Sequence, residues 1–267
     1  MLPIRDRLPT RRAPVVNYAL IALNIVAFVW MQALLSVGYP PQLMLVEYGL
    51  VPQRLVHAPL DGGWMVFTSM FMHDPSGWLH LGGNMLFLWI FGDNVEDALG
   101  RARYLGFYLL SGIAAAAAQV FVDPTSPIPM VGASGAISGV LAAYGSLYPR
   151  SPVMVLNPIL PLWFIFGLFF ELPAWLVILE YFAVNLLNAL GSIGLRGGGV
   201  AVFAHLGGFV AGLILIRLFM IGRTRKEHER WSSWRSPRRP SRRHGGLGGP
   251  GGYGQRPPAR RGGPWDW

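Results

Sequence analysis

The sequence predicts an all-α, polytopic membrane protein with six transmembrane helices and a disordered basic tail. The first observation is composition: 52% of the 267 residues are hydrophobic and 13% are charged, whereas a soluble domain carries about 25% charged residues. The second is a series of apolar stretches long enough to approach the width of a bilayer, and the third is a matching distribution of basic residues. The absence of cysteine excludes thiol catalysis, thiolate metal sites and disulfides.

Six apolar stretches approach the length of about 20 residues that a transmembrane helix needs. They are residues 17–36, 79–95, 103–122, 134–149, 171–190 and 201–221. The first follows four arginines and so resembles a signal peptide. It is longer than the apolar region of a usual signal peptide and lacks a small-x-small cleavage site, so we expect an uncleaved first helix.

The basic residues orient these helices, because cytoplasmic loops carry an excess of Lys and Arg. Four arginines precede the first span, and 12 Lys and Arg residues with only three acids follow Gly222. On the opposite side, the loops contain only Arg54 and Arg196. Six spans with both termini in the cytoplasm fit this distribution, and we expect a multi-pass protein of a bacterial inner membrane.

An apolar segment at 153–170 is a rival seventh span. A seventh span would place the basic tail outside the cytoplasm, against the charge distribution, and Pro158 and Pro161 interrupt the segment. We therefore expect an apolar connection in or near the inner interface, and whether it is interfacial or re-entrant stays open. The choice matters because a seventh span would move His205 to the opposite side of the bilayer from Ser134.

The chain therefore divides into a cytoplasmic N-terminal segment at 1–16, a six-helix membrane domain at 17–221 and a tail at 222–267. The tail carries the whole net charge of +9, since residues 1–222 hold 10 basic and 10 acidic residues. It is rich in Gly, Pro and Arg with little apolar content, which predicts disorder. We expect it to anchor the topology in the cytoplasm; contact with anionic lipid is the alternative, and we expect no nucleic-acid partner.

Three of the predicted helices begin at the outer face with polar residues. His80 and Asn84 lie one turn apart on one face of the second helix. Ser134 begins the fourth helix, and His205 lies about one turn into the sixth. An ionisable residue within a span is a functional candidate, and in this topology all four residues lie at a similar depth.

The depth of Ser134 follows from the length of its helix. Arg150 lies 16 residues further on, or about 24 Å along a helix, whereas the hydrocarbon core is about 30 Å thick. We therefore expect Ser134 below the outer surface, and we expect residues 123–132 to dip inward as irregular backbone that lines a polar recess. Cleavage of a peptide bond within a membrane requires such a sunken nucleophile.

Glycines flank this serine and recur near the histidine. The GxxxG pairs are Gly135–Gly139 in the fourth helix and Gly208–Gly212 in the sixth. Small residues let two membrane helices approach closely, which explains these glycines but not the histidine. The same close contact is the only way for a short serine to meet His205, so the packing and the catalytic interpretations are complementary.

The polar residues predict nucleophilic catalysis. A serine hydroxyl is a weak nucleophile until a base removes its proton, and histidine is the usual base. No acidic residue is placed to orient His205, so we expect a Ser134–His205 dyad rather than a triad. The expected oxyanion donors are His80, Asn84 and the backbone N–H of Ser134. We expect no cofactor and no metal, since the HExxH of zinc proteases is absent and no pair of aspartates lies within the spans.

These motifs occur together in the order seen in one family. HxxxN begins at His80, GASG spans 132–135 and AHxxG begins at Ala204, within a match that starts at about Tyr48. In this combination the chain resembles the rhomboid intramembrane serine proteases. The resemblance implies a six-helix protease that cleaves transmembrane substrates near their outer ends. It assigns Ser134 as the nucleophile, His205 as the general base, and His80 with Asn84 to the oxyanion site.

The family's ExxxG motif is matched by Glu96 and Gly100. The resemblance implies a structural role for Glu96, which would tie the loop after the first helix to the second helix. The predicted spans place that loop and Glu96 on opposite sides of the membrane, so the partner of Glu96 stays open.

Three positions depart from the family pattern. Trp64 is followed by Met65, where an arginine is common, and His73 lies seven residues before His80, where a spacing of five is common. Ser138 stands where some members have a tyrosine that stacks on the base. The last departure leaves open what orients His205.

A substrate helix must reach Ser134 sideways from the lipid, so we expect the glycine-rich loop at 191–200 to work with the fifth helix as a gate. The alternative to a protease is a catalytically silent rhomboid-like protein that binds transmembrane helices. Loss of Ser134 or His205 would mark such a protein, and both are present. The expected partners are transmembrane protein substrates and the bilayer, while the identity of the substrate and the oligomeric state stay open.

Overall fold

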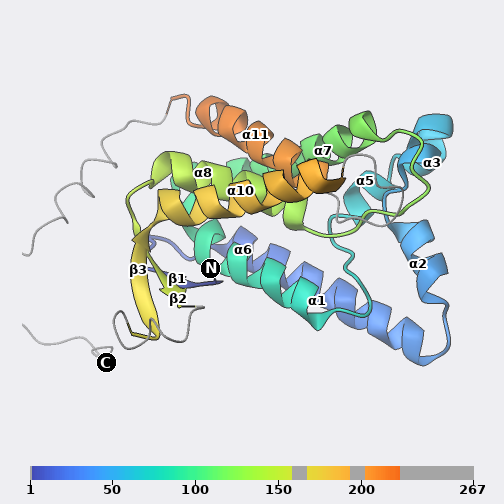
Figure 1. The fold of residues 1–267 in the computed structure, drawn as a ribbon, viewed down its shortest axis with the longest axis horizontal. Helices are drawn as coiled ribbons and strands as arrows, with labels where there is room; N and C mark the ends of the chain where they lie inside the picture. The colour runs from blue at the N-terminus through green and yellow to red at the C-terminus, as the bar shows by residue number, and fades with distance from the viewer. Residues whose placement is uncertain (1, 158–166, 193–201, 223–267) are drawn as a thin grey trace, which may run out of the picture. The chain divides into compact units, whose positions relative to one another are not determined.

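The computed structural model describes residues 2–157, 167–192 and 202–222, all of which belong to the first of the chain's two units, Met1–Gly222. This part is mostly helical, as predicted. Its six long helices are α1 (Val15–Ser36), α6 (Trp78–Leu99), α7 (Arg101–Val122), α8 (Ser134–Leu147), α10 (Ala174–Ser192) and α11 (Val202–Phe219), which lie side by side as a bundle (Figure 1).

Membrane-spanning character is clear for part of this bundle. Within the described residues, α1, α7 and α11 are long and apolar enough to cross a membrane. The apolar segments Ser134–Leu147 of α8 and Ala174–Leu187 of α10 are shorter. The predicted membrane protein is thereby confirmed in outline, whereas the count of six spans stays a prediction. The predicted tail at 222–267 lies outside the described residues except for Gly222.

Short helices fill the connection between α1 and α6. They are α2 (Pro41–Tyr48), α3 (Pro52–His57), α4 (Pro59–Gly62) and α5 (Met65–Thr68). Three of the four begin with proline, which is favoured at a first helical position because its missing N–H would have no acceptor there. Figure 1 shows α2, α3 and α5 at one end of the bundle, where α1 ends and α6 begins.

A small β-sheet lies at the opposite end of the bundle (Figure 1). It is antiparallel in the order β1 (Leu2–Asp6), β2 (Pro152–Leu156) and β3 (Phe169–Pro173). The prediction of an all-α fold is wrong here, because the two ends of the predicted apolar connection at 153–170 form strands. Residues 158–166 lie outside the described part. Alternate residues of β2 are buried, but its partner strand comes from the N-terminus, which no local pattern reveals.

Helix α8 is the centre of the bundle. Every residue from Gly135 to Tyr144 is buried, and a helix that is apolar on all sides belongs in an interior. The surrounding helices instead expose large apolar side chains, among them Val26 on α1, Leu187 on α10 and Ile214 on α11. Side chains of this kind suit a lipid environment, so the exposed apolar surface fits a membrane protein with α8 at its core.

The expected close contact between the helices of Ser134 and His205 is present. A Cβ added at Gly208 would overlap the backbone carbonyl of Gly135, and one added at Gly212 would lie 2.5 Å from the carbonyl oxygen of Gly139. Only glycine permits this separation, because any larger residue would push the two backbones apart. The glycines therefore bring α8 and α11 together at the ends that carry the candidate site.

Glu96 ties the start of α1 to the end of α6. Its buried carboxylate accepts hydrogen bonds from the backbone N–H groups of Val16 (3.2 Å) and Asn17 (2.7 Å). These donors belong to the first turn of α1, where N–H groups have no acceptor within the helix. The expected link to the loop after the first helix is therefore wrong, and the true partner lies on the same side of the bundle as Glu96. Gly100 follows with a φ of 76°, a left-handed conformation that lets α6 end and α7 begin at one residue.

Candidate active site

Ser134 and His205 meet at the ends of two helices. Ser134 is the first residue of α8, and the Nε2 atom of His205 on α11 lies 2.7 Å from its Oγ atom. This is the distance of a strong hydrogen bond. The two residues are 71 positions apart in the chain, and the close glycine contact between α8 and α11 brings them together. The structure thus places the predicted nucleophile and base in direct contact.

The other ring nitrogen of His205 also has a partner. Its Nδ1 atom lies 2.5 Å from the Oδ1 atom of Asn185 on α10. The Nδ2 atom of Asn185 donates to the backbone carbonyl of Tyr181, one turn earlier in the same helix, at 2.8 Å. The prediction left open what orients His205, and this amide is the group that contacts it.

Tyr181 also reaches the helix of the serine. Its hydroxyl lies 2.8 Å from the Oγ atom of Ser138, which in turn donates to the carbonyl of Ser134 at 2.7 Å. A carbonyl oxygen only accepts, so the hydroxyl proton of Ser138 is donated to Ser134. The Tyr181 O–H must therefore be the donor between the two hydroxyls. A tyrosine on α10 therefore fills the space beside the small Ser138 by hydrogen bonding to it.

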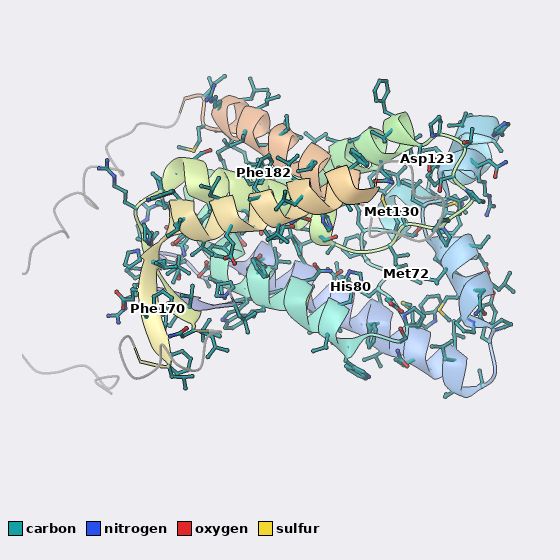
Figure 2. The ribbon with its side chains drawn as sticks, viewed as in Figure 1. Met72, His80, Asp123, Met130, Phe170 and Phe182 are labelled. Carbon is teal, nitrogen blue, oxygen red and sulfur yellow. The ribbon has the colours of Figure 1, made fainter. Side chains whose placement is uncertain are left out.

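His80 presents an N–H to the region beside Ser134. Its Nδ1 atom accepts the backbone N–H of Asp74 at 3.3 Å, so its proton lies on Nε2. A Cβ added at Gly132 would be 3.1 Å from that Nε2 and 3.4 Å from the Ser134 Oγ. The φ of 128° at Gly132 and this lack of space both require glycine there. His80 Nε2 and Ser134 Oγ therefore border the same small space. Figure 2 shows that His80 and Met130 lie in the same part of the bundle, whereas Phe170 lies at the end that carries the β-sheet.

Asn84 is held by a second histidine, His73. The Nδ1 atom of His73 lies 3.3 Å from the carbonyl of Phe71, and its Nε2 atom lies 3.0 Å from Asn84 Nδ2. Burial, with a smaller contribution from His80, lowers the pKa of His73 to about 4, so the ring is neutral near pH 7. A neutral ring that donates through Nδ1 must accept through Nε2, so Asn84 is the donor. One N–H of the Asn84 amide is used in this way, and this bond fixes the orientation of the amide.

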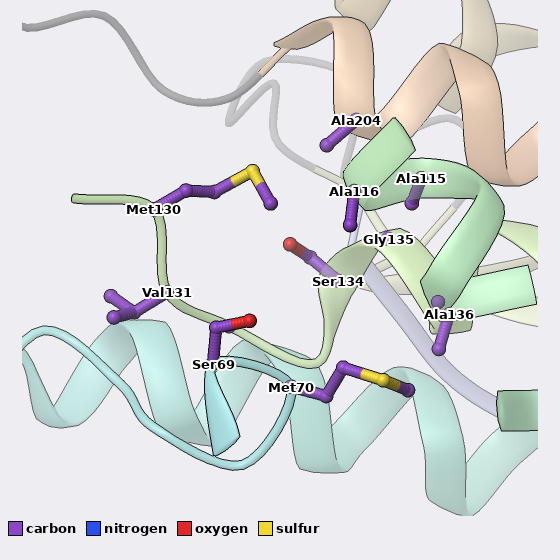
Figure 3. A pocket seen from close by; sticks show the side chains of 12 residues that line it. Ser69, Met70, Ala115, Ala116, Met130, Val131, Ser134, Gly135, Ala136 and Ala204 are labelled. Carbon is purple, nitrogen blue, oxygen red and sulfur yellow. The ribbon is translucent and has the colours of Figure 1, made fainter. Parts of the chain in front are cut away.

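A small cavity lies beside Ser134. It has a volume of about 20 Å³ and is lined mainly by small side chains, with Ser69, Met130 and Ala204 among its walls. Figure 3 shows the Ser134 hydroxyl directed into this space, between Met130 and Ala116. The loop that carries Met130 is fixed by a hydrogen bond from Gly132 N–H to the Ser69 carbonyl at 2.9 Å. A cavity of this volume holds about one water molecule.

Two site residues were missed by the sequence analysis. The sequence marks His73 only by its spacing from His80, and no motif includes Asn185. The spacing of His73 from His80 is a signal in the sequence, but its bond to Asn84 is not. Among the described residues, no group of three or more His, Asp or Glu residues is arranged to hold a metal ion. The predicted gate loop at 191–200 lies almost entirely outside the described part.

Known proteins are similar to this chain in sequence. Residues 61–221 match the family model of the Rhomboid domain. The chain is 28% identical over 203 residues to Rhomboid protein 1, mitochondrial, of Saccharomyces cerevisiae, which covers 74% of this chain and 51% of that protein. It is 36% identical over 130 residues to Rhomboid protease GluP of Bacillus subtilis, which covers 49% of this chain and 24% of that protein. The match to Rhomboid protease AarA of Providencia stuartii is 31% over 138 residues, 46% of this chain and 47% of that protein. The chain therefore spans about half or less of the length of these relatives.

Proposed function

The chain belongs to the rhomboid family, and from this premise we propose that it is an intramembrane serine endopeptidase that hydrolyses peptide bonds in or near transmembrane helices of other proteins. The observation that carries the proposal is the 2.7 Å separation of Ser134 Oγ and His205 Nε2. Two of the similar proteins are named proteases. We further propose that the protein resides in a bacterial inner membrane with both termini in the cytoplasm.

Acylation begins with the Ser134 hydroxyl. Its oxygen attacks the carbonyl carbon of the scissile bond while the hydroxyl proton passes to Nε2 of His205. A new carbon–oxygen bond forms, and the carbonyl oxygen takes up negative charge. The imidazolium then gives its proton to the leaving amine, the carbon–nitrogen bond breaks, and an ester to Ser134 remains.

The oxyanion is stabilised by three donors. His80 supplies Nε2–H and Asn84 supplies the second N–H of its amide, which His73 holds in place. The backbone N–H of Ser134 is the third, because the first N–H groups of a helix have no acceptor within it and lie at the positive end of its dipole. Removal of one such donor typically raises the activation barrier by about 3–4 kcal/mol.

Deacylation requires a water molecule next to the ester. The cavity beside Ser134 has room for about one. His205 takes a proton from this water, the hydroxide attacks the ester carbonyl, and the proton returns to Ser134 Oγ as the carboxylic acid leaves. The enzyme is thereby restored.

Cleavage of a reporter transmembrane substrate by the purified protein in detergent tests the proposal. Wild type should cut, while Ser134→Ala and His205→Ala should be silent. A fluorophosphonate probe on the same samples separates two cases if nothing is cut. Labelling that depends on Ser134 would show a competent enzyme with an unsuitable substrate. No labelling of well-folded protein would contradict the proposal and favour a catalytically silent protein that binds helices.

A further inference from the structure

We propose that Asn185 is a positioning residue that holds His205 in its productive tautomer, so that the catalytic unit is Ser134–His205–Asn185 rather than a dyad. The inference rests on the proposed function and goes beyond it in assigning a role to α10. It starts from the 2.5 Å contact between His205 Nδ1 and Asn185 Oδ1.

The orientation of the Asn185 amide follows from its second contact. The group 2.8 Å from its other end is the backbone carbonyl of Tyr181, which only accepts hydrogen bonds. The Nδ2 atom must therefore face Tyr181, and the Oδ1 atom must face His205. A flipped amide would direct two acceptors at each other on the Tyr181 side.

The tautomer of His205 follows from the orientation of that amide. Oδ1 has no proton, so His205 must carry a proton on Nδ1 to bond to it. In the neutral ring the Nε2 atom is then unprotonated, and it accepts the hydroxyl proton of Ser134 at 2.7 Å. The opposite tautomer would place a proton on Nε2, and His205 would be unable to act as a base toward Ser134. Asn185 thus selects the form of His205 that the reaction needs.

An amide suits this position better than a carboxylate. A charge within a membrane-spanning bundle is costly, and a neutral acceptor orients the ring without introducing one. Asn185 is itself fixed, because Tyr181 lies one turn earlier on the same face of α10 and donates to Ser138 of α8. The helix that carries Asn185 is therefore anchored to the helix that carries Ser134.

This arrangement makes the orientation of the base depend on the position of α10. His205 lies on α11 and Ser134 on α8, whereas the group that orients the ring lies on the third helix. Displacement of α10 from α8 would separate Asn185 from His205, and the Nδ1-protonated tautomer of His205 would no longer be favoured.

The direct test is the protonation site of His205 in the full-length protein. Selective ¹⁵N labelling of histidine gives signals from six residues, and the His205→Ala spectrum identifies the one that belongs to His205. At neutral pH the wild type should show a proton on Nδ1, and Asn185→Ala should show a mixture of tautomers. A wild-type His205 protonated on Nε2, or an unchanged tautomer in Asn185→Ala, would overturn the proposal whether or not the protein cleaves.

Kinetics provide the second readout. Asn185→Ala should lower kcat by about 10- to 100-fold with a KM within a few-fold of wild type, because only part of a general-base contribution of about 10²–10⁴ is lost. Asn185→Asp keeps an acceptor oxygen at the same place and should recover part of kcat, whereas Asn185→Leu keeps similar bulk without an acceptor and should not. Recovery of kcat in Asn185→Leu would indicate a mere packing role.

A matched control is Asn24→Ala. Asn24 is a buried asparagine of α1 whose Nδ2 donates to the carbonyl four residues earlier, Leu20, at 2.8 Å, as Asn185 does to Tyr181. It should change stability without changing kcat or the tautomer. If the tautomer follows Asn185 but wild type neither cleaves nor reacts with fluorophosphonate, the proposed function fails while the positioning role stands.

Discussion

The contact between α8 and α11 makes a sharp prediction about a residue that touches no substrate. Gly208 lies one turn after His205 and packs on Gly135, the neighbour of Ser134. A Cβ at Gly208 would lie 2.9 Å from the carbonyl carbon of Gly135, and closer still to its oxygen, whereas ordinary contacts begin at 3.4 Å. Because the obstacle is backbone, Gly208→Ala must push the two helices apart.

The size of the displacement sets the size of the effect. Relief of the carbon contact alone needs about 0.5 Å, and relief of the oxygen contact needs more than about 1 Å. The Ser134–His205 distance would then grow from 2.7 Å beyond the range of a good hydrogen bond, about 3.2 Å. A misplacement of about 1 Å can cost about 100-fold in rate, and the overpacking should lower the free energy of unfolding by about 1–3 kcal/mol.

The assay is cleavage of the reporter substrate together with thermal unfolding in the same detergent. Gly82→Ala is the matched control, because Gly82 is also a helical glycine but a Cβ there would meet nothing within 4 Å. Its activity should stay near wild type and its stability within about 1 kcal/mol. A folded Gly208→Ala protein with wild-type activity would show that this contact does not set the distance between nucleophile and base.

Three further predictions concern other parts of the molecule. Asn84→Ala should lower kcat by about 10²–10³ with little change in KM, since an oxyanion donor acts in the transition state; an effect on KM alone would contradict its role. Glu96→Ala should lower the free energy of unfolding by about 2–3 kcal/mol, because two buried N–H groups lose a charged acceptor, and kcat of the folded protein should not change. Burial raises the pKa of Asp6 from 3.8 to about 6, so the folded protein binds more protons than the unfolded chain between these values. The free energy of unfolding should therefore fall as pH rises through this window, by at most about 3 kcal/mol. Asp6→Asn should abolish that contribution, and an Asp6→Asn protein with the same pH profile of unfolding as wild type would refute this prediction.

Local patterns in the sequence predicted the helical part of the fold well. The stretch predicted at 17–36 is α1, Val15–Ser36, and the one predicted at 134–149 is α8, Ser134–Leu147. The apolar content of each stretch is a local property, which explains why the ends agree within a few residues. The short helices of the first connection and the β-sheet were not predicted, because their stability depends on neighbours far away in the chain.

The partner of Glu96 shows how a nonlocal contact escapes sequence reasoning. Its motif indicated a structural role, but the two N–H groups that it binds lie about 80 residues earlier in α1. Backbone donors leave no trace in the residue types at those positions. Residue types do not distinguish the start of α1 from its end as the partner of Glu96. The packing of α1 against α6 selects the start.

The sequence by itself determined that the chain is a mostly helical membrane protein of the rhomboid type, with Ser134 and His205 as the candidate catalytic pair and glycines to bring their helices together. Composition, spacing and residue chemistry suffice for those conclusions. Only the tertiary structure decided how the ring of His205 is held. Nothing in the sequence distinguishes Asn185 from other asparagines of the predicted spans; its oxygen reaches Nδ1 because α10 packs beside α8 and α11, and because the Tyr181 carbonyl fixes which end of the amide faces the histidine.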